Sequence, residues 1–141
     1  MPTIDEVFEQ MSASIASDAH DTIVVDPVER VLIVPKSERI FGVERDADSE
    51  RKYFCCPATV GDNIKLANSS VRIDIINAEG GIYDYDVDDV TIDGDKALFS
   101  WLIREEVAQF VGDIKFALHI ESGSKQWNTT YATGTVLPGY C

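Results

Sequence analysis

The residues most suggestive of chemistry are aspartates gathered in one short stretch of the chain. They are Asp84, Asp86, Asp88, Asp89, Asp93 and Asp95. Their opening D-x-D-x-D spacing resembles the start of an EF-hand calcium loop, which needs Gly at its sixth position and a bidentate Glu at its twelfth. Counted from Asp84, those positions hold Asp89 and Asp95, so the motif fails. We interpret the stretch as a solvated strand face followed by a turn, with a cation at an interface as the alternative, and predict no metal site.

Histidine, serine and cysteine chemistry also finds little support. His20 lies in a polar stretch, His119 lies on the polar side of an alternating segment, and no serine occupies a G-x-S-x-G elbow. Cys55 and Cys56 are adjacent, so on a strand they point to opposite faces. Together with Cys141 they give neither a zinc spacing nor a disulfide framework. We therefore predict buried structural cysteines, no catalytic residue, no cofactor, and a protein that is not an enzyme.

Two aromatic residues near the C-terminal end could instead stack on a sugar. Trp127 is followed by Asn128-Thr129-Thr130 and then by Tyr131, which would align aromatic and amide groups along one segment. Trp127 and Tyr131 are therefore the candidate carbohydrate residues. The alternative interpretation is that they form a packed edge or an interface.

The charge balance excludes several classes of partner. With 25 acidic and 12 basic residues the formal net charge is −13. Nucleic-acid binding depends on clustered Lys and Arg, so nucleic acid is not expected, and neither is an anionic membrane surface. The first residues, 1–6, have no basic or apolar region of a signal peptide, and no apolar run approaches the roughly 20 residues of a membrane span.

The first twenty residues differ in pattern from the rest of the chain. Apolar residues recur there at spacings of three and four, which draws one stripe along a helix. The stripe consists of Ile4, Val7, Phe8, Met11 and Ile15. A lone helix this short is marginal in water, so its stripe must pack against either the same domain or a neighbouring chain. We predict that residues 1–20 are an assembly or docking helix and that the stripe residues are its interface candidates.

From residue 21 to residue 141 the pattern becomes that of short strands. The segment Val71–Ile75 alternates apolar and polar residues, as a half-buried strand does. The run Ala97–Ile103 is apolar at nearly every position and is expected to be buried on both faces. A last strand is expected over roughly Lys125–Leu137. About eight strands with turn signals every ~8–12 residues predict one antiparallel β-sandwich domain over residues 21–141.

Three stretches of turn and strand residues resemble a known family. The first comprises Val34-Pro35-Lys36, Gly42-Val43-Glu44-Arg45-Asp46 and Glu50-Arg51-Lys52-Tyr53-Phe54. The second comprises Val60-Gly61-Asp62-Asn63-Ile64 and the strand Val71–Asn77. The third comprises Phe99-Ser100-Trp101-Leu102, Val107-Ala108, Gly112-Asp113-Ile114-Lys115-Phe116, Trp127-Asn128-Thr129 and Gly134-Thr135-Val136-Leu137.

Over about residues 30–140 these stretches resemble the N-terminal domain of upper-baseplate and fibre proteins (BppU-like) of tailed phages and prophages of Gram-positive bacteria. The resemblance implies an immunoglobulin-like sandwich that attaches a fibre or receptor-binding module to the virion. Such proteins usually continue into a stalk, whereas this sequence ends at Cys141. The expectation is therefore an attachment or adaptor domain.

These expectations combine into one predicted function. We expect a phage virion structural protein of the baseplate, the tail or a head fibre, synthesised in the host cytoplasm and acting by protein–protein assembly. Its expected partners are other virion proteins and copies of itself, with a trimer among the expected forms, and neither nucleic acid nor a membrane. The alternative is a carbohydrate-binding β-sandwich module that takes part in recognising the host surface.

Overall fold

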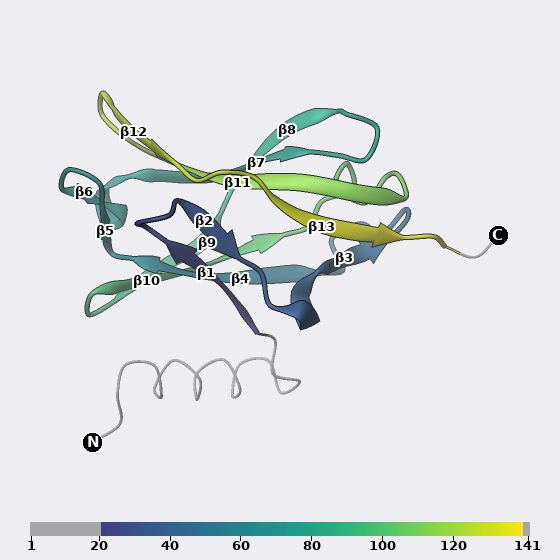
Figure 1. The fold of residues 1–141 in the computed structure, drawn as a ribbon, viewed down its shortest axis with the longest axis horizontal. Helices are drawn as coiled ribbons and strands as arrows, with labels where there is room; N and C mark the ends of the chain where they lie inside the picture. The colour runs from purple at the N-terminus through teal and green to yellow at the C-terminus, as the bar shows by residue number, and fades with distance from the viewer. Residues whose placement is uncertain (1–20, 140–141) are drawn as a thin grey trace, which may run out of the picture.

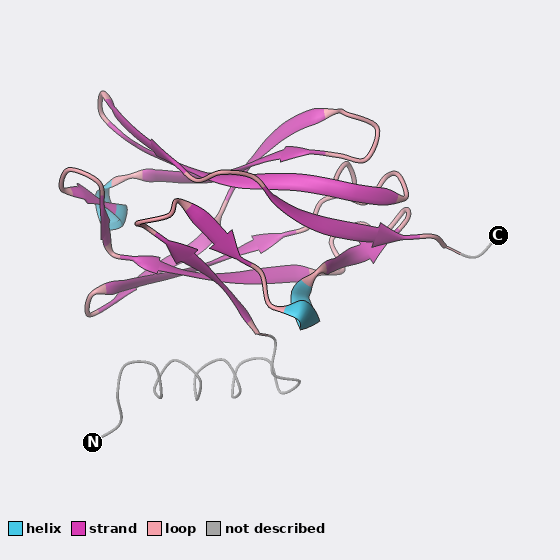
Figure 2. Cartoon of the chain, in the orientation of Figure 1, coloured by secondary structure: helices cyan, strands magenta, loops and turns pink. Residues whose placement is uncertain are grey.

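The protein is mainly β, and its computed structural model describes residues 21–139. The helix predicted over residues 1–20, with its interface candidates, lies outside the described residues, as does Cys141. The described part contains thirteen strands and two short 3₁₀ helices, η1 (Lys36–Glu38) and η2 (Leu66–Asn68) (Figure 2). Neither helix has the length and apolar character needed to cross a membrane.

Two sheets pack face to face and form the body of the domain (Figure 1). The first sheet has the order β2-β1-β4-β10-β9, with β2 at Val31–Ile33, β1 at Thr22–Asp26, β4 at Arg51–Pro57, β10 at Lys96–Leu102 and β9 at Asp88–Asp93. The second has the order β3-β13-β11-β7-β8, with β3 at Ile40–Val43, β13 at Ala132–Leu137, β11 at Gly112–Ser122, β7 at Ser70–Ile76 and β8 at Ile82–Asp86. Strand β12 (Lys125–Asn128) also pairs with β11, and β5 (Thr59–Val60) and β6 (Ile64–Lys65) form a small ribbon.

The structure differs from the predicted antiparallel β-sandwich of about eight strands in the direction of two strand pairs and in the number of strands. Strand β1 runs parallel to β4, and β3 runs parallel to β13, so both large sheets are mixed. The chain leaves the first sheet after β2, passes through η1 and enters the second sheet as β3, which brings an early segment beside the last strand. Several of the additional strands have only two to four residues, too few for alternation to reveal them.

The segment expected to form one final strand is instead divided in two. Strands β12 and β13 are separated by residues 129–131, and both pair with the long strand β11. The break changes which side chains face inward. In particular, Trp127 pairs with the buried Ile120 and therefore turns toward the core.

The core is centred on three aromatic rings contributed by both sheets. Phe41 of β3 lies 5.0 Å from Phe116 of β11 and 5.8 Å from Trp101 of β10, measured between ring centroids. All three side chains are fully buried. Gly134 of β13 makes room for them, because a Cβ atom there would lie 2.3 Å from Phe41 Cδ1. The run 97–103 is buried at most positions, and Trp101 lies deep inside.

One buried ion pair links the two sheets. Lys52 of β4 places its Nζ 3.4 Å from Glu38 Oε1 in η1, and both side chains are almost wholly buried. The same ammonium donates a hydrogen bond of 2.7 Å to the carbonyl of Ile40 and lies 4.8 Å from the centroid of Phe41. The pair therefore anchors the crossover between the sheets to the aromatic centre.

Candidate functional site

The acidic stretch does not form one site, because the fold divides it between the sheets. Asp84 and Asp86 lie on β8 of the second sheet, whereas Asp88 begins β9 of the first. Asp84 faces Arg72 at 3.7 Å, and Asp88 accepts a hydrogen bond of 3.0 Å from Arg51. Within residues 21–139 no three His, Cys, Asp or Glu side chains gather in a metal-binding arrangement.

The described histidine and cysteines lie in structural surroundings. His119 is buried, with Nδ1 against Asn128 Oδ1 and Nε2 4.0 Å from Glu121. Cys55 and Cys56 are both buried, and only Cys56 belongs to the core cluster, as expected for neighbours on opposite faces of a strand. Burial, with a further contribution from Cys55, raises the pKa of the Cys56 thiol to about 12. The prediction of buried structural cysteines is confirmed for this pair.

The two candidate carbohydrate residues do not form an open platform. Trp127 is 2% exposed, and the Arg30 guanidinium lies 4.6 Å from the centroid of its ring. Arg30 is held there by a hydrogen bond of 3.1 Å from Nη1 to the carbonyl of Asn128. Tyr131 is 53% exposed on the loop before β13. A cation therefore covers the face of the Trp127 ring that was expected to meet a sugar. The ring is packed against the domain rather than open to solvent.

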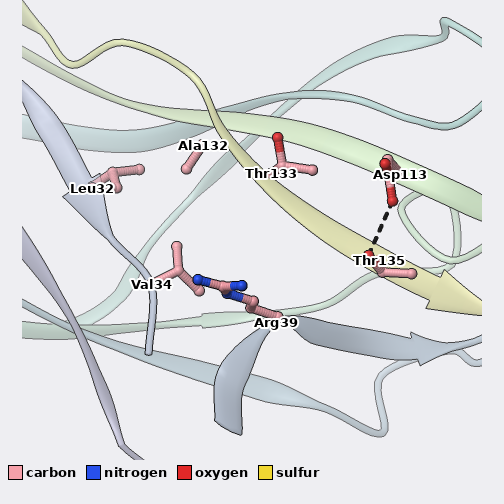
Figure 3. Close-up of a pocket in the computed structure, with 7 residues that line it drawn as sticks. All are labelled: Leu32, Val34, Arg39, Asp113, Ala132, Thr133 and Thr135. Carbon is pink, nitrogen blue, oxygen red and sulfur yellow. Dashed lines mark hydrogen bonds between the residues drawn. The ribbon is translucent and has the colours of Figure 1, made fainter. Parts of the chain in front are cut away.

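An open groove lies between the edge of the first sheet and strand β13 of the second (Figure 3). Its volume is about 410 Å³, and it is lined by Leu32, Val34, Arg39, Asp113, Ala132, Thr133 and Thr135. Val34 and Ala132 also pack against the core, so the floor of the groove is apolar and fixed. No sequence motif marks these residues, because they come from four separate segments of the chain.

Both strands beside this groove have an open edge within the described residues. Strand β2 pairs with β1 alone, and β3 pairs with β13 only from Thr135 onward. The N–H of Thr135 donates to the carbonyl of Arg39 at 2.8 Å, so its main-chain groups point away from β11. Since this orientation repeats every second residue along a strand, Thr133 presents its N–H and C=O to the groove. The groove therefore offers a strand edge that another strand can extend.

Two charged side chains, one of each sign, line this edge. Thr135 Oγ1 donates to Asp113 Oδ1 at 3.0 Å, which holds that carboxylate beside β13. The Arg39 guanidinium extends toward Val34 in Figure 3 and forms no hydrogen bond or ion pair within residues 21–139. An extended segment that carries a carboxylate would satisfy both the open edge and this cation.

A second surface is the outer face of the first sheet. Paired residues on neighbouring strands form one row across it: Ile33, Val24, Cys55 and Leu98, which we name the apolar row. Their neighbours along the strands, among them Phe54 and Cys56, point into the core instead. Val24 and Ile33 are 42% and 52% exposed, whereas Leu98 is half-buried and Cys55 is buried. An apolar row thus lies on the outside of a domain whose formal net charge is −13.

Comparison with known proteins assigns no family to the chain. No family model matches it, and no curated protein matches it. Among solved structures it is similar to the N-terminal domain of phage TP901-1 ORF48, with a TM-score of 0.43 and 12% identity over 82% of this chain and 94% of that one. A likeness this distant carries no argument about function.

Proposed function

We propose that this chain is a structural component of a tailed-phage virion, an attachment or adaptor domain of the baseplate, the tail or a head fibre. It acts by binding other virion proteins and performs no catalysis. The observation that carries the proposal is the groove with its open strand edges, a feature suited to joining one protein chain to another. The resemblance of residues 30–140 to the upper-baseplate family supplies the virion context.

The groove supports a particular mode of binding. An extended segment of a neighbouring virion protein adds as a strand beside β13, with main-chain hydrogen bonds to Thr133 and a carboxylate against Arg39. Main-chain bonds give such an interface affinity, and the pockets for alternate side chains give it specificity. Leu32 and Val34 on the opposite side would receive the inward-facing side chains of the added strand.

We further propose that the sandwich is of the immunoglobulin type. Strands β4, β10 and β9 are adjacent in one sheet, and β13, β11, β7 and β8 are adjacent in the other. That arrangement agrees with strands B, E and D facing G, F, C and C′ of a variable-type immunoglobulin domain. The parallel pairing of β1 with β4 is an additional feature that this scheme does not explain.

The stretches that carry the family resemblance have structural roles in this fold. Gly42 has φ +142°, and a Cβ there would lie 3.2 Å from Asp46 Oδ2. That carboxylate accepts a hydrogen bond of 2.9 Å from the N–H of Val43 and closes the turn. Gly134 leaves space for Phe41. The resemblance therefore rests on residues that build the sandwich, and it supports a shared architecture more directly than a shared partner.

Incorporation into particles tests the proposed function. A phage lacking this gene is complemented with the unaltered chain, Thr133→Pro or Arg39→Glu, and the purified particles are quantified by mass spectrometry. Thr133→Pro removes the N–H that faces the groove, and Arg39→Glu reverses its charge. We expect each change to lower the number of incorporated copies by about tenfold or more, equivalent to 1.4 kcal/mol of binding.

The matched control is Lys65→Glu, which makes the same charge change at an exposed position that does not line the groove. It should be incorporated like the unaltered chain. If the protein never copurifies with particles and its deletion leaves them unchanged, the proposed function is wrong. If the protein is incorporated but both groove variants are too, the virion role stands and the groove is not its binding surface.

A further inference from the structure

Four adjacent strands of the first sheet have sequences suited to burial on both faces. Apolar residues follow one another in Ile23-Val24-Val25, Val31-Leu32-Ile33-Val34, Phe54-Cys55-Cys56 and Ala97-Leu98-Phe99. Strands covered on one side alternate between apolar and polar residues, whereas near-continuous apolar runs are typical of strands covered on both. The inner residues of these strands form the sandwich core. Packing of the two sheets therefore explains only half of the apolar pattern.

The outer half of the pattern is continuous across these four strands. The apolar row runs from β2 through β1 and β4 to β10, and Tyr53 and Leu102, both half-buried, lie on the same outer face. With neighbouring strands about 4.8 Å apart, the row is roughly 14 Å long. Its ends differ in exposure, because Ile33 is on an edge strand and Leu98 lies between two strands. A surface of this length fits one helix rather than an isolated side chain.

The chain itself supplies a segment of matching length and chemistry. Residues 4–15 carry the stripe Ile4, Val7, Phe8, Met11 and Ile15, and as a helix they would be about 18 Å long. The first twenty residues contain no Lys or Arg, and the acids Asp5, Glu6 and Glu9 alternate with the stripe on the other side. Such a helix would cover the row with its stripe and turn its acids to solvent.

The position of the connection favours docking within one chain. Residues 16–21 join the stripe to Thr22, which begins β1 inside this same sheet and pairs with Tyr53 on its outer face. When extended, those residues reach about 20 Å, which is more than the length of the row. A tether this short sets an effective concentration in the millimolar range, so no second molecule is needed to bring the surfaces together.

We propose that residues 4–15 dock as a helix, in the same chain, on the apolar row of the β2-β1-β4-β10-β9 sheet. This inference rests on the sequence and the sheet, and it does not depend on the proposed virion role. It resolves the choice that the sequence leaves open between packing on the domain and packing on a neighbouring chain. The groove at the edge of the sheet remains free for a partner.

A thiol placed at Ile33, the most exposed residue of the apolar row, reports whether the row is covered. In an Ile33→Cys/Cys141→Ser background, the rate at which a soluble aromatic disulfide modifies that thiol is measured for the otherwise unaltered chain and for Phe8→Asp/Met11→Asp. Both substituted residues precede the strands of the sandwich, which begin at Thr22. We expect a monomer by light scattering in both cases and a modification rate at least about tenfold higher in the variant.

The matched control is Gln10→Asp/Ala13→Asp, which adds the same two charges away from the stripe and should leave the rate unchanged. Ile33→Asp gives the reciprocal test, since altering the row should speed chymotrypsin cleavage after Phe8. An unaltered chain that is an oligomer and becomes a monomer on Phe8→Asp/Met11→Asp would overturn docking in the same chain. Equal thiol rates in all three chains, with Phe8 cleaved equally fast before and after Ile33→Asp, would overturn it as well.

Discussion

The two outer faces of the sandwich differ sharply in the chemistry of equivalent rows. On four strands of the first sheet the row consists of Ile33, Val24, Cys55 and Leu98, and Thr91 of β9 continues it. Across the second it consists of Asp86, Arg72, His119 and Asn128. The second face also carries ion pairs, because Arg72 Nε lies 3.5 Å from Asp74 and 3.7 Å from Asp84.

This difference indicates that only one of the two faces is adapted to water. Both sheets bury their inner residues in one shared core, so the need for a core cannot explain why one outer face is apolar. Large exposed apolar surfaces on soluble domains generally mark contacts. The charged outer face of the second sheet is solvated, whereas the apolar outer face of the first sheet is adapted to being covered. The groove beside β13 is a separate contact surface, which offers a strand edge.

The two outer faces belong to sheets that share one core, so we expect both sheets to unfold together. Lys52→Met should have the largest effect on this shared core. The change leaves Glu38 buried without the ammonium 3.4 Å away. Removing one member of a buried ion pair costs about 3–5 kcal/mol, because the other charge stays buried without that partner. We expect the free energy of unfolding, measured by urea denaturation, to fall by that amount. Both sheets should unfold in a single transition.

The double variant Lys52→Met/Glu38→Leu is the control for that prediction. Replacing both members of a buried pair by apolar residues is often neutral or stabilising. Most of the lost stability should therefore return. A double variant as unstable as the single one would show that the ion pair is not the source of the loss.

Gly134→Ala tests the inner packing that both faces share. The added Cβ would lie 2.3 Å from Phe41 Cδ1, so the aromatic centre must shift. Overpacking of this kind costs about 1–3 kcal/mol. The melting temperature and the denaturation midpoint should both fall, whereas Thr133→Ala on the same strand, at an exposed position, should change them little. Equal stability of the two variants would contradict the packing described for Phe41.

At alkaline pH the stability of the fold should depend on the ionisation of Cys56, whose side chain lies in the core. The pKa of the Cys56 thiol is raised from 9.0 to about 12 by burial, so the folded protein keeps a proton that the unfolded chain releases. Its contribution to stability is complete below pH 9 and declines as the pH rises toward 12. Burial and the hydrogen bond to Glu106 raise the pKa of Tyr85 in the same direction.

The free energy of unfolding should therefore fall above pH 9, by at most about 1.4 kcal/mol per pH unit for each such group. Cys56→Ala should reduce the slope between pH 9 and pH 11 even if it lowers stability at neutral pH. Denaturant titrations at a series of pH values measure both. An unchanged slope in Cys56→Ala would mean that this thiol ionises freely in the fold.

Sequence reasoning succeeded where one strand's own pattern was decisive. Alternation located β7, and the continuous apolar run located β10, whose inner residues are buried and whose outer residues Leu98 and Leu102 are half-buried. The mixed pairing could not be predicted, because it depends on which distant strands meet across the crossover after β2. Trp127 looked available for a sugar because its cover, Arg30, comes from a loop far away in the sequence. The groove has no motif at all, since separate segments form it.

The central claim is that the outer apolar face is covered by the chain's own stripe, and a double-mutant cycle between Val24→Ser and Phe8→Asp/Met11→Asp tests it most directly. Burying a Val side chain is worth about 1.5–3 kcal/mol, so Val24→Ser at a partly exposed site should cost about 1 kcal/mol when the stripe covers it. In the stripe variant the same change should cost no more than about 0.5 kcal/mol, as at an uncovered surface. A coupling of about 0.5 kcal/mol or more, measured on monomeric protein, is the result we predict. Strictly additive effects of the two changes would contradict the claim.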